Sequence, residues 1–231
     1  MVCCGLFRPD ESERELRAYI DAMQSFIRAE QPISAQAHDM LGAFLEQKAR
    51  LHEAADARRA YRGMLVDKFG EGSVYTTVGA LKLAQVLIKV GSLAEARSVL
   101  EASLKVKEST SYFHPLEMLP EVVELADVSL QCDDIPRSLD LCVRALTLHK
   151  STISTDEVVT GALLARIARI LSSQGHINPA IQTYRDVLGM YQRNLGSEHP
   201  QATAITELLV ILDRANHDYE AAAEDTKRFY R

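Results

Sequence analysis

Apolar residues follow a helical spacing through most of the chain, and this spacing recurs with a fixed period. Leu83 to Leu104 reads as two apolar helical stretches joined by a tight turn at Gly91. Each second helix carries a small residue at the same place, and this position recurs every 42 residues: Ala54, Ala96, Ser138, Ala180 and Ala222. An apolar or aromatic residue precedes it by three positions: Leu51, Leu93, Ile135, Ile177 and Tyr219. Each first helix carries an aliphatic residue with a mostly small neighbour: Leu41–Gly42, Leu83–Ala84, Leu125–Ala126, Ile167–Ala168 and Leu209–Val210.

Five copies in register predict a tandem array of helical hairpins, because stacked units share one continuous core. We expect an all-α, right-handed α–α superhelix of about five helix pairs. A helix at residues 10–30, in register with the second helix of a unit, is expected to cap the first repeat. The solenoid is expected over residues 31–231, with repeats at about 33–68, 73–107, 115–150, 155–194 and 199–231.

The repeats are expected to reverse direction at equivalent positions. Gly91 suits a left-handed helix cap, and Asp133, Gly175 and His217 occupy the same place in later repeats. The chain then stops at or within the second helix of the fifth repeat. Phe229 and Tyr230 are therefore expected to lie on an exposed apolar surface that a partner or a second copy would cover.

Composition and charge remove several classes of function. Apolar residues make up 47% of the chain, and the net charge of −6 argues against nucleic acid as a partner. No apolar run reaches the roughly 18 uncharged residues that a membrane span requires. Cysteines are too few and too irregular for a disulfide framework, which indicates a reducing, cytoplasmic location. Cys132 and Cys142 are expected to be small buried apolar residues.

The first nine residues read as a disordered tail that carries two adjacent cysteines. Cys3 and Cys4 lie beside Leu6, Phe7 and Arg8, and they are candidates for palmitoylation and for peripheral contact with a membrane. The alternative is an unmodified tail. A second signal would be needed for stable anchoring.

The pattern of an aliphatic–small pair, a turn, and an Ala in the second helix resembles the tetratricopeptide repeat (TPR). The period of 42 exceeds the usual TPR period of about 34 and resembles the kinesin light chain subclass. Leu195 to Leu212, LGSEHPQATAITELLVIL, is similar to the segment that opens repeats of that subclass. Repeats of the HEAT type have a similar period, but the recurring Ala favours the TPR. The kinesin light chain asparagines that bind cargo are not reproduced, since Lys82, Glu124, Arg166 and Leu208 occupy their positions.

The resemblance implies a concave groove lined by the first helices of the repeats, where an extended or helical segment of a partner protein would bind. Its candidate contact residues are Leu81, Gln85, Ile88, Lys89, Val123, Asp127, Leu130, Gln131, Arg169, Ser173, Glu207 and Arg214. The groove is expected to begin acidic, at Asp39 and Glu46, and to end with Arg169 and Arg214, which would bind acidic groups. Alternatively, the apolar members pack between repeats and the arginines pair with Asp127 or Glu207.

Three functions remain open, and we favour a non-catalytic adaptor or scaffold for a protein partner. An enzyme is disfavoured, because no metal-binding HExxH, phosphate-binding glycine loop or glycine-flanked nucleophilic serine occurs. No cofactor or metal is implied. The third candidate is a self-assembling subunit of a larger complex, associated with the cytoskeleton or a membrane, that pairs through its C-terminal helix.

Overall fold

The computed structural model describes residues 13–18, 21–22, 31–111, 113–150 and 156–229, and of residues 218–229 it describes the helical backbone. The chain divides into two compact units, Met1–His114 and Pro115–Arg231. Cys3, Cys4 and Tyr230 lie outside the described residues, so the predictions for them stay predictions. The same is true of most of the predicted capping segment, of which residues 13–18 and 21–22 are helical.

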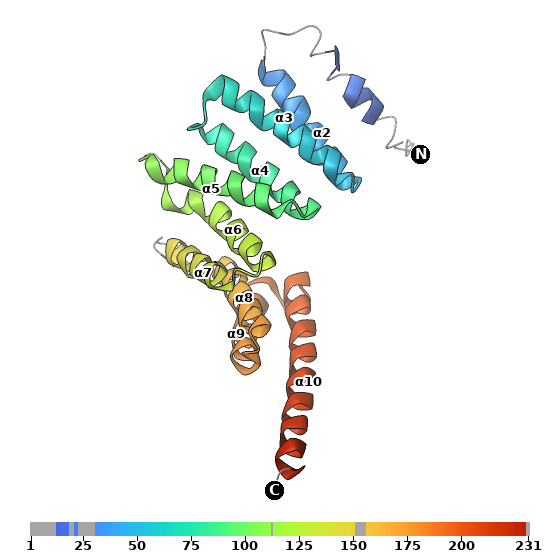
Figure 1. Ribbon diagram of the computed structural model, residues 1–231, viewed down its shortest axis with the longest axis vertical. Coiled ribbons are helices and arrows are strands. Elements are labelled where there is room, and N and C mark those ends of the chain that lie inside the picture. Colours follow the sequence, from blue (N-terminus) through green and yellow to red (C-terminus); the bar gives the residue numbers. More distant parts are fainter. Residues whose placement is uncertain (1–12, 19–20, 23–30, 112, 151–155, 230–231) are drawn as a thin grey trace. The chain divides into compact units, whose positions relative to one another are not determined.

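The first unit contains two helical hairpins (Figure 1). Helix α2 (Gln31–Gln47) packs on α3 (Leu51–Phe69), and α4 (Val74–Val90) packs on α5 (Leu93–Ser109). Helices α3 and α4 are also in contact, so the two hairpins share a core.

The second unit begins with the short 3₁₀ helix η1 (Pro115–Met118) and continues with two hairpins and a long final helix. Helix α6 (Leu119–Gln131) packs on α7 (Ile135–Lys150), and α8 (Glu157–Ser173) packs on α9 (Ile177–Leu195). The last helix, α10 (Pro200–Phe229), packs on α9. The described residues contain no strand, and the prediction of an all-α fold of packed helix pairs is confirmed.

Small residues hold each hairpin closed, as the period predicts. Ala54, Ala96 and Ala180 in the second helices are completely buried. In the third hairpin Ser138 takes this position, and its hydroxyl donates a hydrogen bond of 2.7 Å to the carbonyl oxygen of Ala126. A side chain at this position can therefore be polar if it is small and its polar atom is bonded.

Four hairpins reverse at equivalent residues with a positive φ angle. Ala49, Gly91, Asp133 and Gly175 have φ values of 56°, 86°, 59° and 78°. The turns predicted at Gly91, Asp133 and Gly175 are thus confirmed. Ala49 and Asp133 show that the fold imposes this left-handed conformation even on residues that disfavour it.

The fifth repeat differs, because the turn predicted at His217 does not form. Helix α10 is continuous through this position for 30 residues. Residues 201–231 contain neither Gly nor Pro, and Ala221 to Glu224 all favour helix. In the third and fourth hairpins, by contrast, Pro136 and Pro179 lie in the first turn of the second helix, where proline is tolerated. The register alone was therefore insufficient to predict a turn.

The two cysteines of the third hairpin differ in exposure. Cys142 is buried, as predicted, and burial raises the pKa of its thiol to about 11. Cys132 is exposed, which corrects the prediction. It follows the last residue of α6 as the C-cap, so it lies beyond the face that packs on α7.

Candidate functional site

In the first unit, carboxylates on one first helix bind cations on the next first helix. Asp39 Oδ2 of α2 lies 2.7 Å from Lys82 Nζ of α4, and Glu46 Oε2 lies 2.9 Å from Lys89 Nζ. Buried Arg58 of α3 also bonds to Asp39, and its Nη2 lies 3.0 Å from Glu46 Oε1. The carboxylates expected to make this surface acidic are therefore neutralised by three cations.

The same arrangement recurs in the second unit, where two cations meet one carboxylate. Asp127 of α6 accepts a hydrogen bond of 3.0 Å from Arg166 Nε of α8 and another from Arg169. The side chain of Asp127 is 19% exposed, whereas that of Arg169 is 54% exposed. Two guanidinium groups thus share one carboxylate, and Arg169 retains donors that face solvent.

These side chains border a cavity of about 330 Å³ in the second unit. Its walls come from the first helices α6, α8 and α10 and from the second helix α9: Asp127, Ala162, Ala165, Arg166, Arg169, Tyr184, Tyr191, Gln201, Ile205 and Leu208. We call this cavity the arginine pocket. It combines two cations with aliphatic and aromatic surface. This composition suits a ligand segment that carries an acidic group beside an apolar side chain.

Two tyrosines of α9 form one wall of the arginine pocket. Burial raises the pKa of Tyr184 and of Tyr191, and the charges of Arg169 and Arg166, respectively, act in the opposite direction. Both phenols are therefore neutral near pH 7 and can donate hydrogen bonds. Tyr191 packs tightly against α8, since a Cβ built on Gly161 would lie 2.7 Å from its Cε1.

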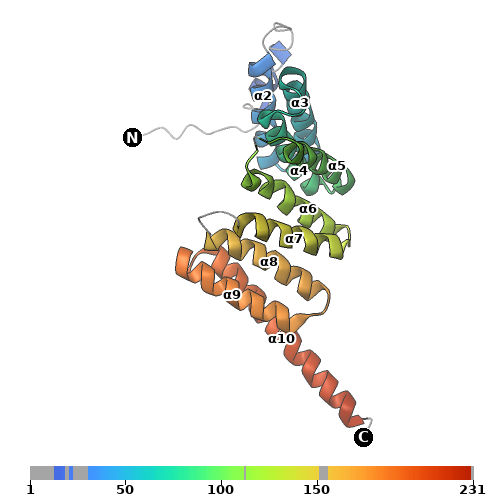
Figure 2. The ribbon, with the colours of Figure 1, turned by 90° about the vertical axis from the view of Figure 1, so that its left-hand side faces the viewer.

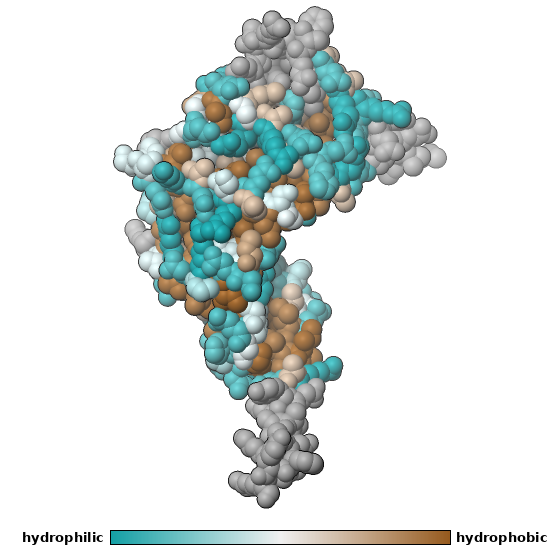
Figure 3. All heavy atoms as spheres, in the orientation of Figure 1, coloured by the Kyte–Doolittle hydropathy of each residue, from teal (hydrophilic) through white to brown (hydrophobic). Residues whose placement is uncertain are grey.

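Helix α10 contributes Gln201, Ile205 and Leu208 to the pocket. Leu208 and Ile211 follow Arg166 and Arg169 by one period of 42 residues, so the cation positions of α8 become aliphatic in α10. The exposed fractions are 41% for Leu208 and 62% for Ile211. Figure 3 shows apolar surface on the described part of α10.

Two of the predicted contact residues line the arginine pocket, and the others do not. Asp127 and Arg169 lie together in the arginine pocket. Arg214, predicted to act with Arg169, is exposed on α10 but does not line the pocket; Arg166 does instead. Ser173 is exposed and its hydroxyl donates a hydrogen bond to Ile170 O. The others are exposed (Gln85, Lys89, Gln131 and Glu207) or half-buried (Leu81, Ile88, Val123 and Leu130).

Sequence reasoning missed Arg166, Tyr184 and Tyr191 as members of this pocket. Arg166 was compared only with the asparagines of kinesin light chains, although it lies one turn before Arg169 on the same helix. The tyrosines belong to a second helix, which the groove prediction did not include. Tyr184 and Tyr191 are seven residues apart, a spacing that places both on one face of α9 and would have identified them as a pair.

Residues 160–201 match the family model of the tetratricopeptide repeat. Residues 160–201 are thus a tetratricopeptide repeat. The matched segment contains most of α8 and all of α9, and thus Arg166, Arg169 and both tyrosines of the arginine pocket. A search of curated proteins finds no match.

Several solved structures have a similar fold. One is a single-substitution variant of nearly identical TPR-like repeats from a candidate kinesin light chain of Podosopora anserina. Its TM-score is 0.68, and it is 18% identical over 87% of this chain and 95% of that one. BtubC (BKLC) from P. vanneervenii has a TM-score of 0.68 and 12% identity over 84% and 77% of the two chains. The structure of pilF from Pseudomonas aeruginosa has a TM-score of 0.52 and 17% identity, over 96% of this chain and 93% of that one. At these identities the likeness concerns the fold.

The part of the chain that the structure describes contains neither a metal-ligand cluster nor a membrane-spanning helix. There, no three His, Cys, Asp or Glu side chains come together as metal ligands. None of the helices described has both the length and the apolar character needed to traverse a bilayer.

Proposed function

We propose that this TPR protein is a non-catalytic adaptor that holds an acidic segment of a partner protein in the arginine pocket. TPR folds in general mediate protein–protein interaction. The observation that carries the more specific proposal is the excess of cationic charge, since Arg166 and Arg169 face the single carboxylate of Asp127. A carboxylate from a partner would restore the balance of charge.

The geometry favours a carboxylate more than a neutral polar group. Arginine presents its donors as a planar fork that matches the two oxygens of a carboxylate. Arg169 is the more exposed of the pair and would make the first contact, while Tyr184 and Tyr191 can donate further hydrogen bonds. A carboxylate bound here would be partly desolvated, which strengthens its attraction to both arginines.

Apolar residues beside the arginines determine what should flank the acidic group. Leu208 lines the same pocket and is 41% exposed, and an aliphatic or aromatic side chain of the partner would bury this surface. The expected ligand is therefore a short segment in which Asp or Glu lies close to a large apolar residue.

The test is selection of a random peptide display library on the purified protein. Wild type should enrich peptides with Asp or Glu near Leu or Phe. Arg169→Glu should lose this preference, and Arg169→Ala should weaken it without adding a repulsive charge. Asp127→Asn should bind the enriched peptides more tightly, because the competing carboxylate is removed.

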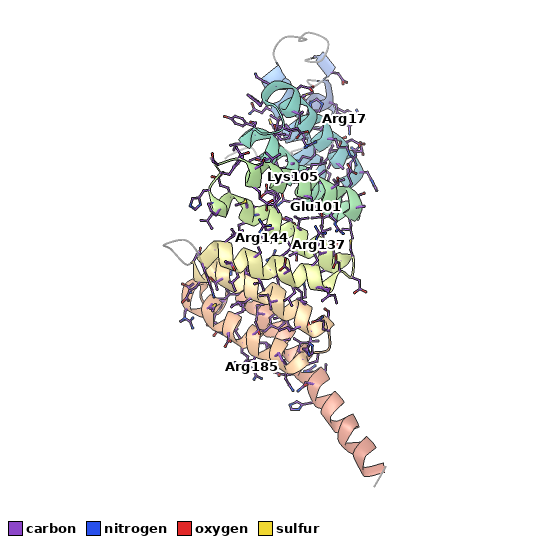
Figure 4. All side chains as sticks on the ribbon, turned by 60° about the vertical axis from the view of Figure 1, so that its left-hand side comes forward. Arg17, Glu101, Lys105, Arg137, Arg144 and Arg185 are labelled. Carbon is purple, nitrogen blue, oxygen red and sulfur yellow. The ribbon has the colours of Figure 1, made fainter. Side chains whose placement is uncertain are left out.

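A matched control comes from α9, where Arg185 is similarly exposed but does not line the pocket. Figure 4 labels this residue. Arg185→Glu should leave peptide selection unchanged. Enrichment without an acidic bias, or an identical peptide set on Arg169→Glu, would contradict the proposal.

A further inference from the structure

A second cavity, of about 260 Å³, lies in the first unit, where α4 contacts both α3 and α5 (Figure 2). Most of its lining residues are small or aliphatic, and the full set is Arg62, Glu71, Thr76, Thr77, Ala80, Ala102, Ser103, Lys105 and Val106. We call it the Arg62 cavity. All of these residues belong to the first unit, whereas the arginine pocket belongs to the second.

Two residues that border the Arg62 cavity depart from the repeat pattern. Ala80 is buried in α4, and the same position carries the larger Val122 one period later and Leu164 two periods later. Arg62 of α3 also differs from its counterparts. In the next three repeats its position carries leucine: Leu104, Leu146 and Leu188. The first unit thus has a smaller side chain at one of these positions and a cation at the other.

The chain satisfies Arg62 only in part. Its Nη2 lies 2.8 Å from Glu71 Oε2. Its Nε is buried and, in the described part of the chain, has no hydrogen-bond partner. A buried donor without an acceptor is destabilising, so a ligand that accepts from Nε would make a bond that the free protein lacks. The side chain of Glu71 is 57% exposed and can turn into solvent when a ligand takes its place.

We propose that the Arg62 cavity binds a small monocarboxylate that carries a hydrocarbon chain. A guanidinium group binds a carboxylate through two parallel hydrogen bonds. The edge that contains Nε and Nη2 of Arg62 offers both donors once Glu71 turns away. Lys105 of α5, labelled in Figure 4, adds a second cation to the lining. The two cations outnumber the carboxylate of Glu71, so the charge of the lining favours an anion.

The rest of the lining favours a hydrocarbon chain. Thr76 and Thr77 donate their hydroxyl hydrogens to backbone carbonyl oxygens, over 2.8 Å and 2.9 Å, and so have none left for a ligand. Aliphatic side chains complete this surface: Ala80, Ala102 and Val106. A cavity of about 150 Å³ holds benzene, so one of about 260 Å³ suits a ligand of about ten non-hydrogen atoms. Octanoate is of this size.

The test is calorimetric titration of the full chain with octanoate. Wild type should bind one octanoate with a dissociation constant on the order of 0.1–1 mM, as expected for so small a ligand. Octanol has the same chain without the charge, and inorganic phosphate has charge without the chain. Each should bind at least about tenfold more weakly than octanoate, because each lacks one of the two sets of contacts.

Three variants test the roles of the lining residues. Arg62→Leu restores the leucine of the next repeats, and it should abolish octanoate binding and raise the melting temperature of the free protein, because it removes the unsatisfied donor. Ala80→Val supplies the side chain of Val122 and should weaken binding at least about tenfold, because it fills part of the cavity while Arg62 remains. Glu71→Gln should tighten binding about two- to fivefold, because it removes a competing exposed carboxylate.

A matched control comes from the same helix. Arg59 of α3 is paired with Glu95 and does not line the cavity, so Arg59→Leu should leave octanoate binding unchanged. Arg169→Glu should also bind octanoate as wild type does, which separates this cavity from the arginine pocket. Three results would overturn the proposal: no binding by wild type at about 10 mM octanoate, equal affinity for octanol, or unchanged binding by Arg62→Leu. A lower melting temperature for Arg62→Leu would contradict it as well, since Arg62 would then be satisfied within the chain.

Discussion

Gly161→Ala tests how closely α8 and α9 approach beside the arginine pocket. Gly161 is buried in α8, and an added Cβ would lie 2.7 Å from Tyr191 Cε1 and 3.3 Å from its Cδ1. Ordinary contact between carbon atoms is about 3.5–4.0 Å. Tyr191 is only 4% exposed and packs within a cluster that includes Val187 and Ile205, so its ring cannot move aside without displacing other core residues.

Two opposing effects set the magnitude of this change. Alanine is favoured over glycine inside a helix by up to about 1 kcal/mol. Overpacking a well-filled core costs about 1–3 kcal/mol. The second effect is the larger, and Gly161→Ala should lower the free energy of unfolding by about 1 kcal/mol.

A matched control lies in the same hairpin. Gly189 is in α9, and an added Cβ would lie 3.4 Å from the end of the exposed Arg193 side chain. Gly189→Ala should therefore gain stability, by about 0.5–1 kcal/mol. The two alanine variants should differ by about 2 kcal/mol, although they make the same chemical change.

Urea unfolding followed by circular dichroism measures this difference, provided that the dependence on urea is the same for both variants. The unfolding midpoint should fall for Gly161→Ala and rise for Gly189→Ala. Equal midpoints for the two variants would show that α8 and α9 are not in close contact at Gly161. The position of Tyr191 in the arginine pocket would then be wrong as well.

Three further outcomes follow from the ion pairs and the cysteines. Arg58→Ala should destabilise the first unit by about 3 kcal/mol, because it removes a buried cation from Asp39 and Glu46; thermal melting would measure this. Burial raises the pKa of the Glu46 carboxyl, but hydrogen bonds from Lys89 and Arg58 outweigh burial and hold it below its usual 4.5. Stability from Glu46 should thus be present above about pH 4.5 and be lost as the pH falls through the lower folded-state pKa, and Glu46→Gln should flatten this acid limb of a stability–pH curve. With Cys3, Cys4 and Cys132 changed to Ser, Cys142 should react with a thiol reagent at pH 8 only after unfolding; rapid reaction in the folded protein would contradict its burial.

The sequence was sufficient to predict the fold because the information about the fold is local and repeated. A small residue such as Ala96 is needed wherever two helices cross closely, and the period of 42 repeats that requirement in every hairpin. The left-handed turns follow from the same register. Even Asp133 adopts one, since the packing on both sides determines the direction of the chain.

The same register failed at the C-terminus, because there it conflicts with local propensity. His217 occupies the position of a turn, yet residues 201–231 contain no Gly or Pro to interrupt the helix. In the other repeats, the packing of the hairpin favours the reversal over a continuous helix.

The arginine pocket could be predicted only in part, since its lining depends on distances between helices. Arg169 and Asp127 were found because they lie one period apart on first helices. Tyr184 and Tyr191 reach the pocket from α9, past small residues of α8 such as Ala162 and Ala165. The sequence pattern marks these alanines as small, but it does not show what fills the space they leave.

The exposure of the additional cation distinguishes the arginine pocket from the first unit, since the side chain of Arg169 is 54% exposed and that of Arg58 is 7% exposed. In the first unit each carboxylate of α2 meets a lysine of α4, and Arg58 completes the pairing in a buried position. In the second unit the arginines of α8 meet only Asp127, because the next period contributes Leu208 and Ile211. Leu208 and Ile211 supply aliphatic surface at these positions but no negative charge. An acidic partner would supply that charge beside them.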